Sequence, residues 1–311
     1  MNSHNENLEV LDTFIDETTH LVSEQEVILS NSININVNQL VSEVSGLVCL
    51  PDIYLKIRGL MYDKTSCLND FAAVVNTDPG LTASVLKIVN SAFYGFPRQI
   101  EDIGRALNLI GIGQLNSLAV SLLSVKSLKL SNDIEPLTTF WRRSIYCGVL
   151  SRLMARNLNL KNEESLFVIG LLHEIGRLIL FHEYPKESRK AAVQAQAENR
   201  SLTEVEKNMF GVDYAQISQA LIAEWNLPIK FQCIIGFHLE PDKATEFTLE
   251  TTIVHIAHKV AANKMSGADN FQYSIDPETL ALVNINHEAM DILSSEADDI
   301  SQDMQKLILG N

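Results

Sequence analysis

Two adjacent ionisable residues, His173 and Glu174, stand inside a stretch that is otherwise strongly apolar, LFVIGLLHEIGRLIL (166–180). Burying an imidazole and a carboxylate costs free energy unless each group finds a partner. Both side chains are metal ligands, so a metal site is one explanation of the pair. The alternative is a structural pair whose only role is to hold helices together. This position is therefore the first candidate site.

Other catalytic motifs are absent from the sequence. It contains no phosphate-binding P-loop, no G-x-G-x-x-G and no G-x-S-x-G elbow. No cysteine has a histidine at a spacing typical of a nucleophile–base pair. The four cysteines are far apart and form no C-x-x-C pair, so we expect reduced thiols rather than a disulfide framework or a zinc ribbon. They are Cys49, Cys67, Cys147 and Cys233.

The charge balance excludes some classes of partner. The 311 residues include 24 Lys and Arg against 39 Asp and Glu, a formal charge of −15. Proteins that bind nucleic acid rely on a basic surface, so we expect no nucleic acid and no anionic membrane as partner. The N-terminus, MNSHNENLEV, is polar and acidic, unlike a secretory segment. No apolar run approaches the roughly 20 residues that span a bilayer. These features predict a cytoplasmic protein.

Helical periodicity extends over most of the chain. Residues 1–32 are predicted to be an acidic amphipathic extension, helical over 8–28, with Leu11, Phe14 and Leu21 on its apolar face. We expect that face to pack on the body or on a second subunit. The role of this extension and the oligomeric state are left open.

Two series of helices follow the extension. Short helices fill residues 36–128, and Asp78-Pro79 is a strong start signal for one of them. Longer helices come after residue 136. Among them we expect residues 166–180 to form one central helix, because the stretch is apolar on nearly all sides. Strict period-two alternation is absent, so the predicted fold class is all-α.

Segments in both series resemble the HDOD domain, a relative of the HD superfamily, over about residues 36–260. The segments that carry the resemblance are Leu50-Pro51, Asp78-Pro79 with Leu81, NSAFYG (90–95), Ile103, Leu109, Gly111, Phe140-Trp141-Arg142, GLLHEIG (170–176) and WNLP (225–228). The resemblance implies a multi-helix fold of two packed lobes, the second similar to an HD-domain core. It also implies an output or regulatory role in bacterial signalling.

HD enzymes are metal-dependent phosphohydrolases, and the resemblance shows where their metal site would fall. The matching positions in this sequence are Arg143, His173, Glu174, Tyr214, His238 and His258. Arg143 stands at the first histidine position, Tyr214 at an auxiliary histidine, and His258 at the final aspartate. Because a guanidinium stays protonated and offers only donors, Arg143 cannot ligate a metal ion. We therefore predict a degenerate site with no catalytic residue, no metal and no cofactor.

The degenerate site also carries a geometric prediction. Arg143, His173, Glu174 and His258 should converge from three helices, with the Arg143 fork bound to Glu174 in bidentate fashion. A rearranged metal site made of His173, Glu174, His238 and His258 is the alternative.

The remaining chain is divided as follows. We expect an HDOD domain at 36–265, with lobes at about 36–128 and 137–265, and C-terminal helices at 275–311 docked on the second lobe. The apolar positions of the C-terminal helices are Leu280, Leu282, Val283, Met290, Leu293, Met304 and Leu307. Tyr94 and Phe96 flank a glycine in a turn, where we expect core packing. The alternative is that they line a groove together with Asn90.

The functional hypothesis that follows is a non-catalytic regulatory module. It would bind a protein partner of a signalling pathway, or a small signalling molecule, in the cleft between the lobes. One rival is a metal-dependent phosphohydrolase that acts on a nucleotide through the rearranged ligands. Another is a structural scaffold without a ligand.

Overall fold

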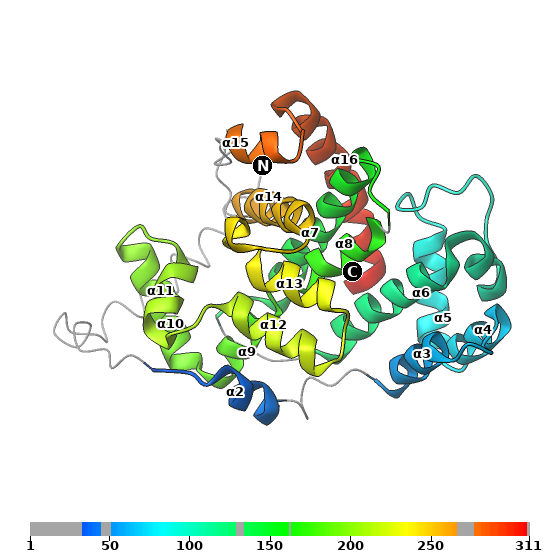
Figure 1. The fold of residues 1–311 in the computed structure, drawn as a ribbon, viewed down its shortest axis with the longest axis horizontal. Helices are drawn as coiled ribbons and strands as arrows, with labels where there is room; N and C mark the ends of the chain where they lie inside the picture. Colours follow the sequence, from blue (N-terminus) through cyan, green and yellow to red (C-terminus); the bar gives the residue numbers. More distant parts are fainter. Residues whose placement is uncertain (1–32, 45–50, 129–133, 162, 266–276, 310–311) are drawn as a thin grey trace, which may run out of the picture.

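The computed structural model describes residues 33–44, 51–128, 134–161, 163–265 and 277–309. Over these ranges the chain is helical and contains no strand, which confirms the predicted all-α class. Figure 1 shows two groups of helices, α3–α6 on the right and α7–α14 in the centre and on the left. The predicted extension 1–32, including its helix at 8–28, lies outside the described residues.

The first lobe consists of short helices and one long interrupted helix. Its elements are α3 (Asp52–Tyr62), α4 (Leu68–Asn76), α5 (Pro79–Val89) and α6 (Ile103–Ser127). The α5 helix starts where the sequence predicts, because Asp78 Oδ1 accepts a hydrogen bond from the Leu81 backbone N–H at 2.9 Å. Gly111 takes a non-helical conformation inside α6 (φ 83°, ψ 165°). Two helical segments therefore follow each other there.

The second lobe is built around α7. Its elements are α7 (Leu137–Asn157), α8 (Glu163–Leu172), α9 (Ile175–Glu183), α10 (Pro185–Ala197), α11 (Leu202–Phe210), α12 (Tyr214–Glu224), α13 (Ile229–Phe237), η1 (Pro241–Lys243) and α14 (Thr248–Met265). Helix α7 packs against both α8 and α14. The α7–α8 crossing is very close, since a Cβ added to Gly170 would lie 2.7 Å from the Gly148 Cα. Two glycines thus let these backbones meet.

The expected single helix over 166–180 is wrong, because the chain breaks at the ionisable pair. Helix α8 ends at Leu172 and α9 begins at Ile175, which leaves His173 and Glu174 in the turn between them. Both helices are buried on nearly every side. Helical periodicity therefore carries no sign of a break, because a change in helix direction moves no apolar residue out to water.

The ends of the described chain both reach across the fold. Helix α2 (Val37–Val44) packs on α12, so this segment lies with the second lobe, although the sequence placed it in the first. Helices α15 (Pro277–Leu282) and α16 (His287–Leu309) follow α14. Helix α16 packs on α7, and it also contacts α5 and α6 of the first lobe. Leu282, expected to be buried, is 70% exposed, whereas Leu280 and Val283 are buried.

The NSAFYG segment forms the junction between the lobes. Asn90 holds the loop closed, since its Nδ2 donates to the Ile100 carbonyl and its Oδ1 accepts from the Ile100 N–H. Phe93 then contacts Phe167 of α8 edge-on, with ring centroids 5.0 Å apart. Arg152 of α7 donates to the Phe93 carbonyl at 2.8 Å and lies over the Phe93 ring at 4.0 Å. This segment therefore docks the first lobe on the second.

Two stretches, 103–125 and 163–183, are long and apolar enough to cross a bilayer by composition alone. The sequence alone had predicted no run of this length. In the fold, 89% of the most apolar window in 163–183 is buried inside the second lobe, and a core helix has the same composition.

Candidate functional site

The structure brings the six HD-like positions together in the second lobe. They are carried by different kinds of element, because only two of them lie inside long helices. Arg143 lies on α7 and His258 on α14, whereas Tyr214 is the first residue of α12 and His238 directly follows α13. The remaining pair comes from the α8–α9 turn. Gly176 of α9 fixes this arrangement, because an added Cβ would come within 2.3 Å of the Tyr214 carbonyl oxygen.

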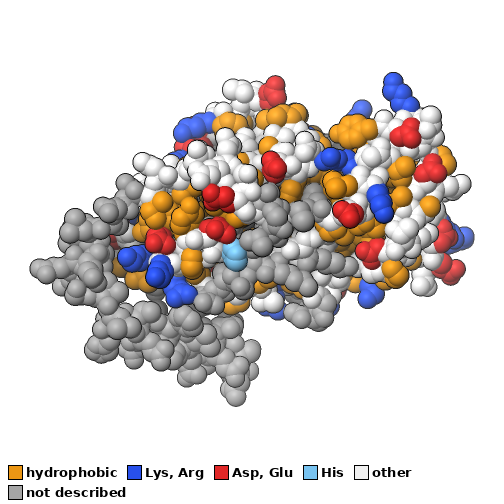
Figure 2. Space-filling view, turned by 90° about the horizontal axis from the view of Figure 1, so that it is seen from below, with side chains coloured by type: hydrophobic (Ala, Val, Ile, Leu, Met, Phe, Trp, Pro, Cys, Tyr) orange, Lys and Arg blue, Asp and Glu red, His pale blue; other side chains and the backbone are white. Residues whose placement is uncertain are grey.

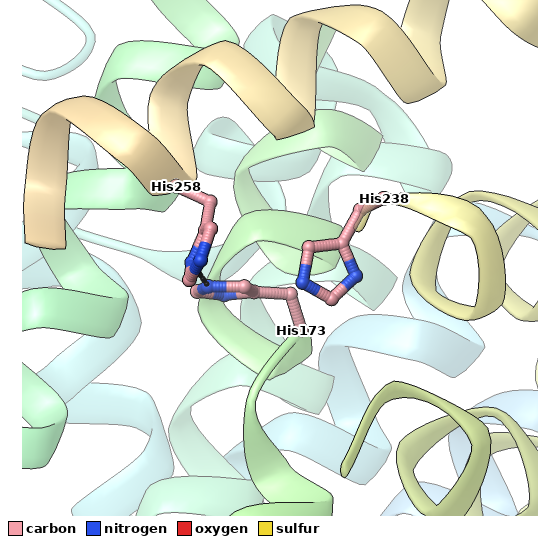
Figure 3. Close-up of side chains that lie close together, drawn as sticks. All are labelled: His173, His238 and His258. Atoms are coloured by element: carbon pink, nitrogen blue, oxygen red, sulfur yellow. Dashed lines mark hydrogen bonds between the residues drawn. The ribbon is translucent and has the colours of Figure 1, made fainter. Parts of the chain in front are cut away.

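Three histidines form the centre of the site. Figure 3 shows His173, His238 and His258 pointing toward one another from three different elements. Their ring centroids are 5.0–5.3 Å apart, and one potential ligand atom of each lies within 4.8 Å of the other two. His173 and His238 are completely buried, and 14% of the His258 side chain is exposed.

Hydrogen bonds decide which nitrogen of each ring carries the proton. The Nδ1 atoms of His173 and His238 contact the carbonyl oxygens of Gly170 at 2.6 Å and of Ile235 at 2.7 Å. Because a carbonyl only accepts, both Nδ1 atoms must be protonated, and in the neutral rings both Nε2 atoms are acceptors. The His173 Nε2 then accepts from His258 Nδ1 at 2.9 Å, and the His238 Nε2 accepts from the Tyr214 hydroxyl at 3.1 Å.

The site favours neutral imidazoles. Burial lowers the pKa of His173 to about 4, although the neighbouring Glu174 charge acts in the opposite direction. Burial also lowers the pKa of His238 to about 3 and places that of His258 well below its usual value. At neutral pH all three rings are therefore uncharged and have lone pairs to offer.

Arg143 and Glu174 are in contact as the sequence analysis expected, but their geometry differs. A single bond joins them, from Arg143 Nε to Glu174 Oε2 at 2.7 Å. The bidentate pair forms instead with Glu135, at 2.6 Å from Nη1 and 3.1 Å from Nη2. The predicted bidentate pair with Glu174 is thus wrong. Glu135 precedes α7 and binds both Nη atoms of the guanidinium. Only Nε then remains to donate to Glu174.

A second arginine completes the coordination of Glu174. Arg177 Nη1 donates to Glu174 Oε1 at 3.0 Å, and its Nη2 contacts Glu206 Oε2 at 3.2 Å and Thr203 Oγ1 at 2.8 Å. Its guanidinium also lies 4.1 Å from the centre of the Tyr214 ring. We call the resulting series, Glu135, Arg143, Glu174, Arg177 and Glu206, the ion-pair chain.

The ion-pair chain keeps Glu174 ionised inside the protein. Burial raises the pKa of this carboxyl, but the charges of Arg143 and Arg177 more than offset burial and hold its pKa well below its usual value. Three carboxylates and two guanidiniums give the chain a formal charge of −1 (−3 + 2). The region around the histidines is therefore not net positive.

Sequence reasoning missed Glu135, Arg177 and Glu206. A signal existed for Arg177, because it is the one cation in the apolar stretch and stands three residues after Glu174, one helical turn away. Glu135 and Glu206 gave no signal, since each stands among other polar residues in a surface-like pattern. Their role depends on how α7 and α11 are placed around the α8–α9 turn.

The expected groove residues divide between two places. A groove of about 630 Å³ separates α5 from α16, and Asn90 lines it together with Leu86, Lys87 and Leu307. Tyr94 and Phe96 are not among its lining residues. Their rings stack on each other, with centroids 5.8 Å apart, at the lobe junction.

The surface of the described residues carries mixed charge. Figure 2 shows acidic and basic side chains interspersed among apolar ones on one face. Neither a continuous basic surface nor a continuous acidic one is visible over the part of that face that is described.

The sequence and the fold both resemble known proteins. The model of the HDOD domain matches residues 47–241. An uncharacterized protein of Treponema pallidum (strain Nichols) is 26% identical over 204 residues. The match covers 64% of this chain but only 39% of that protein, so the chain spans well under half of its relative's length.

Solved structures with low sequence identity share the fold. A candidate phosphohydrolase of Shewanella amazonensis SB2B superposes with a TM-score of 0.69 at 22% identity, over 86% of this chain and 97% of that one. An HDOD domain protein of unknown function from Geobacter sulfurreducens gives 0.69 at 21% identity, over 87% and 96%. A candidate signal transduction protein of Marinobacter aquaeolei VT8 gives 0.66 at 18% identity, over 91% and 64%.

Proposed function

Because this chain belongs to the HDOD family, we propose that it is a non-catalytic regulatory protein that acts by binding a protein partner in a signalling pathway. The observation that carries the proposal is the ion-pair chain. Both oxygens of Glu174, the carboxylate in the HD-like set, are bound by arginines at 2.7 and 3.0 Å. The two guanidiniums hold the pKa of Glu174 well below its usual value, so this carboxylate is a poor base for an attacking water molecule.

Burial supports the same proposal. Hydrolysis of a phosphate ester requires the ester and a water molecule to reach the reacting groups together. His173, His238 and Glu174 are 0–1% exposed, and Arg143 stands where the family resemblance places a ligand histidine. A hydrolytic site would need both an open coordination position and access for the substrate.

Partner binding is supported by the architecture of the chain. Two lobes joined by a docked loop and spanned by α16 present an extended surface of mixed charge. The fold-level likeness to a candidate signal transduction protein points in the same direction.

Turnover assays test the non-catalytic half of the proposal. The purified full chain is incubated with guanine nucleotides and cyclic dinucleotides in the presence of Mg²⁺, Mn²⁺ or Zn²⁺. We expect no hydrolysis above buffer alone. Hydrolysis that is lost in His173→Ala but kept in His182→Ala, a partly exposed histidine outside the site, would overturn the proposal.

Partner binding is tested separately. Affinity capture with the full chain supplies candidates, and the binding constant of each purified candidate is then measured. We expect one partner that binds at fixed stoichiometry and that still binds the His173→Ala variant. If no captured protein binds in purified form, the partner-binding half fails.

The second candidate function is a metal-dependent phosphohydrolase. The specific observation in its favour is the convergence of three neutral imidazoles beside a carboxylate. The turnover assays above decide between the two candidates.

A further inference from the structure

We propose that His173, His238 and His258 bind one late first-row transition-metal ion, with Zn²⁺ as the expected occupant, in a closed site. Three imidazole nitrogens from three elements converge within 4.8 Å of one another. This inference is independent of the proposed function, because a buried metal ion can hold helices together with or without catalysis.

The first support for the metal site is its pre-organised outer shell. Metal-ligating histidines almost always donate their second ring N–H to a carbonyl or a carboxylate, which fixes the ring and its tautomer. His173 and His238 show this arrangement, with Nδ1–H bound to the carbonyls of Gly170 and Ile235 at 2.6 and 2.7 Å. Both Nε2 lone pairs are therefore directed into the cluster.

The second support is the distance between the donor atoms. Tetrahedral zinc with Zn–N bonds of 2.0–2.1 Å places ligand nitrogens about 3.3 Å apart. His173 Nε2 and His258 Nδ1 already lie 2.9 Å apart, a separation close to that of two zinc ligands. For both atoms to bind the ion, His258 must carry its proton on Nε2 instead of Nδ1, which replaces the hydrogen bond between the two rings by two metal bonds. The two nitrogens then need to move by only a fraction of an ångström. His238, within 4.8 Å, must move inward and give up its bond from Tyr214.

A fourth ligand is available from the protein. Glu174 Oε1 lies 3.5 Å from His258 Nδ1 and 3.9 Å from His173 Nε2. Because the two guanidiniums are paired with three carboxylates in the ion-pair chain, they do not create a net repulsion toward a cation. Three histidines and one carboxylate make a four-coordinate site with no open position.

Donor type determines which ion fits. Imidazoles suit Zn²⁺, Ni²⁺ and Cu²⁺, whereas Mg²⁺ and Ca²⁺ prefer sets of oxygen ligands. Three nitrogens and one oxygen therefore predict tight binding of Zn²⁺ and Ni²⁺ and no measurable binding of Mg²⁺. This selectivity separates the histidine site from binding to acidic surface groups, which do not discriminate in this way.

The experiment uses the full chain after removal of metal with a chelator. Isothermal titration with Zn²⁺, and Co²⁺ titration followed by its visible absorption, should both give one equivalent bound, with the absorption of tetrahedral cobalt. X-ray absorption on the zinc-loaded wild-type protein should show nitrogen and oxygen ligands at 2.0–2.1 Å. This last measurement needs no variant, so it tests the site even if the variants do not fold.

Variants then assign the ligands. Loss of an outer-shell partner alone weakens metal binding by 10–100-fold, so His173→Gln, His238→Gln and His258→Gln should each weaken Zn²⁺ binding by at least about 100-fold. His182→Gln, outside the cluster, should bind as the wild type does. Absence of stoichiometric Zn²⁺ binding, or equal binding by His238→Gln and wild type, overturns the proposal. Zn²⁺ binding together with nucleotide hydrolysis would support binding by the three histidines but contradict both the closed four-coordinate form of the site and the proposed function.

Discussion

The protein buries arginines in two regions, and it neutralises them differently. In the second lobe, Arg143 and Arg177 alternate with carboxylates along the ion-pair chain, with contacts of 2.6–3.2 Å. At the lobe junction, Arg152 lies over the Phe93 ring and donates to a carbonyl, while Glu163 and Glu164 stay 3.4 and 3.6 Å away. One region relies on short charge pairs, whereas the other combines a ring face and a neutral oxygen with two longer ion pairs.

The difference indicates in which region a substitution should cost more stability. Removing Arg177 leaves the buried Glu206 without its ion pair, and removing Arg143 leaves the buried Glu174 with one arginine instead of two. Loss of compensation for a buried charge is among the largest penalties a substitution can cause. At the junction, the Tyr94 hydroxyl and Arg152 Nε are buried and have no hydrogen-bond partner among the described residues. The ion-pair chain also leaves one such atom, Glu206 Oε1. The junction therefore differs in how its arginine is held, by cation–π attraction and longer ion pairs rather than by short charge pairs.

The largest expected effect comes from Arg143→Ala. It leaves Glu174 buried with one arginine fewer and removes both bonds to Glu135. We expect a loss of about 3–5 kcal/mol in the free energy of unfolding, measured by urea denaturation. The adjacent Arg142→Ala is the matched control, because Arg142 is exposed. Equal stability of the two variants would show that the ion-pair chain does not stabilise the fold.

A smaller loss is expected for Arg152→Ala at the junction. This variant removes a cation–π contact and one hydrogen bond to the Phe93 carbonyl. Glu163 is partly exposed, and the buried Glu164 loses an ion pair of 3.6 Å, longer than the 2.6 and 2.7 Å pairs of Arg143, so the expected loss is about 2–3 kcal/mol. Arg156→Ala, on the same helix but with a 45% exposed side chain, should lose less than about 1 kcal/mol in the same measurement. A loss for Arg152→Ala as large as that for Arg143→Ala would remove the distinction between the two regions.

The smallest effects compare two tyrosine hydroxyls. Tyr214→Phe deprives the buried His238 Nε2 of its donor and should destabilise the protein by about 1–2 kcal/mol. Tyr94→Phe removes a hydroxyl that has no hydrogen-bond partner among the described residues, so thermal unfolding should be unchanged or shifted upward. Destabilisation by Tyr94→Phe and not by Tyr214→Phe would contradict the difference between these two hydroxyls.

The sequence by itself determined the helical class, the start of α5 and the family. Each of these depends on local patterns: apolar spacing at helical period, a capping aspartate before proline, and motifs such as NSAFYG. The sequence also indicated that Arg143 and Glu174 meet, because the family resemblance supplies the arrangement of the helices that carry them.

Only the tertiary structure decided how those residues are used. It placed His173 and Glu174 in a turn between two helices. It also paired the two Nη atoms of Arg143 with Glu135, and it brought Arg177 and Glu206 into the ion-pair chain. Contacts between residues 29–31 positions apart, such as Arg143 with Glu174 and Arg177 with Glu206, depend on how helices cross. Helical period reports which face of a segment is apolar. It does not report where an all-apolar segment turns, nor which distant carboxylate pairs with a given guanidinium.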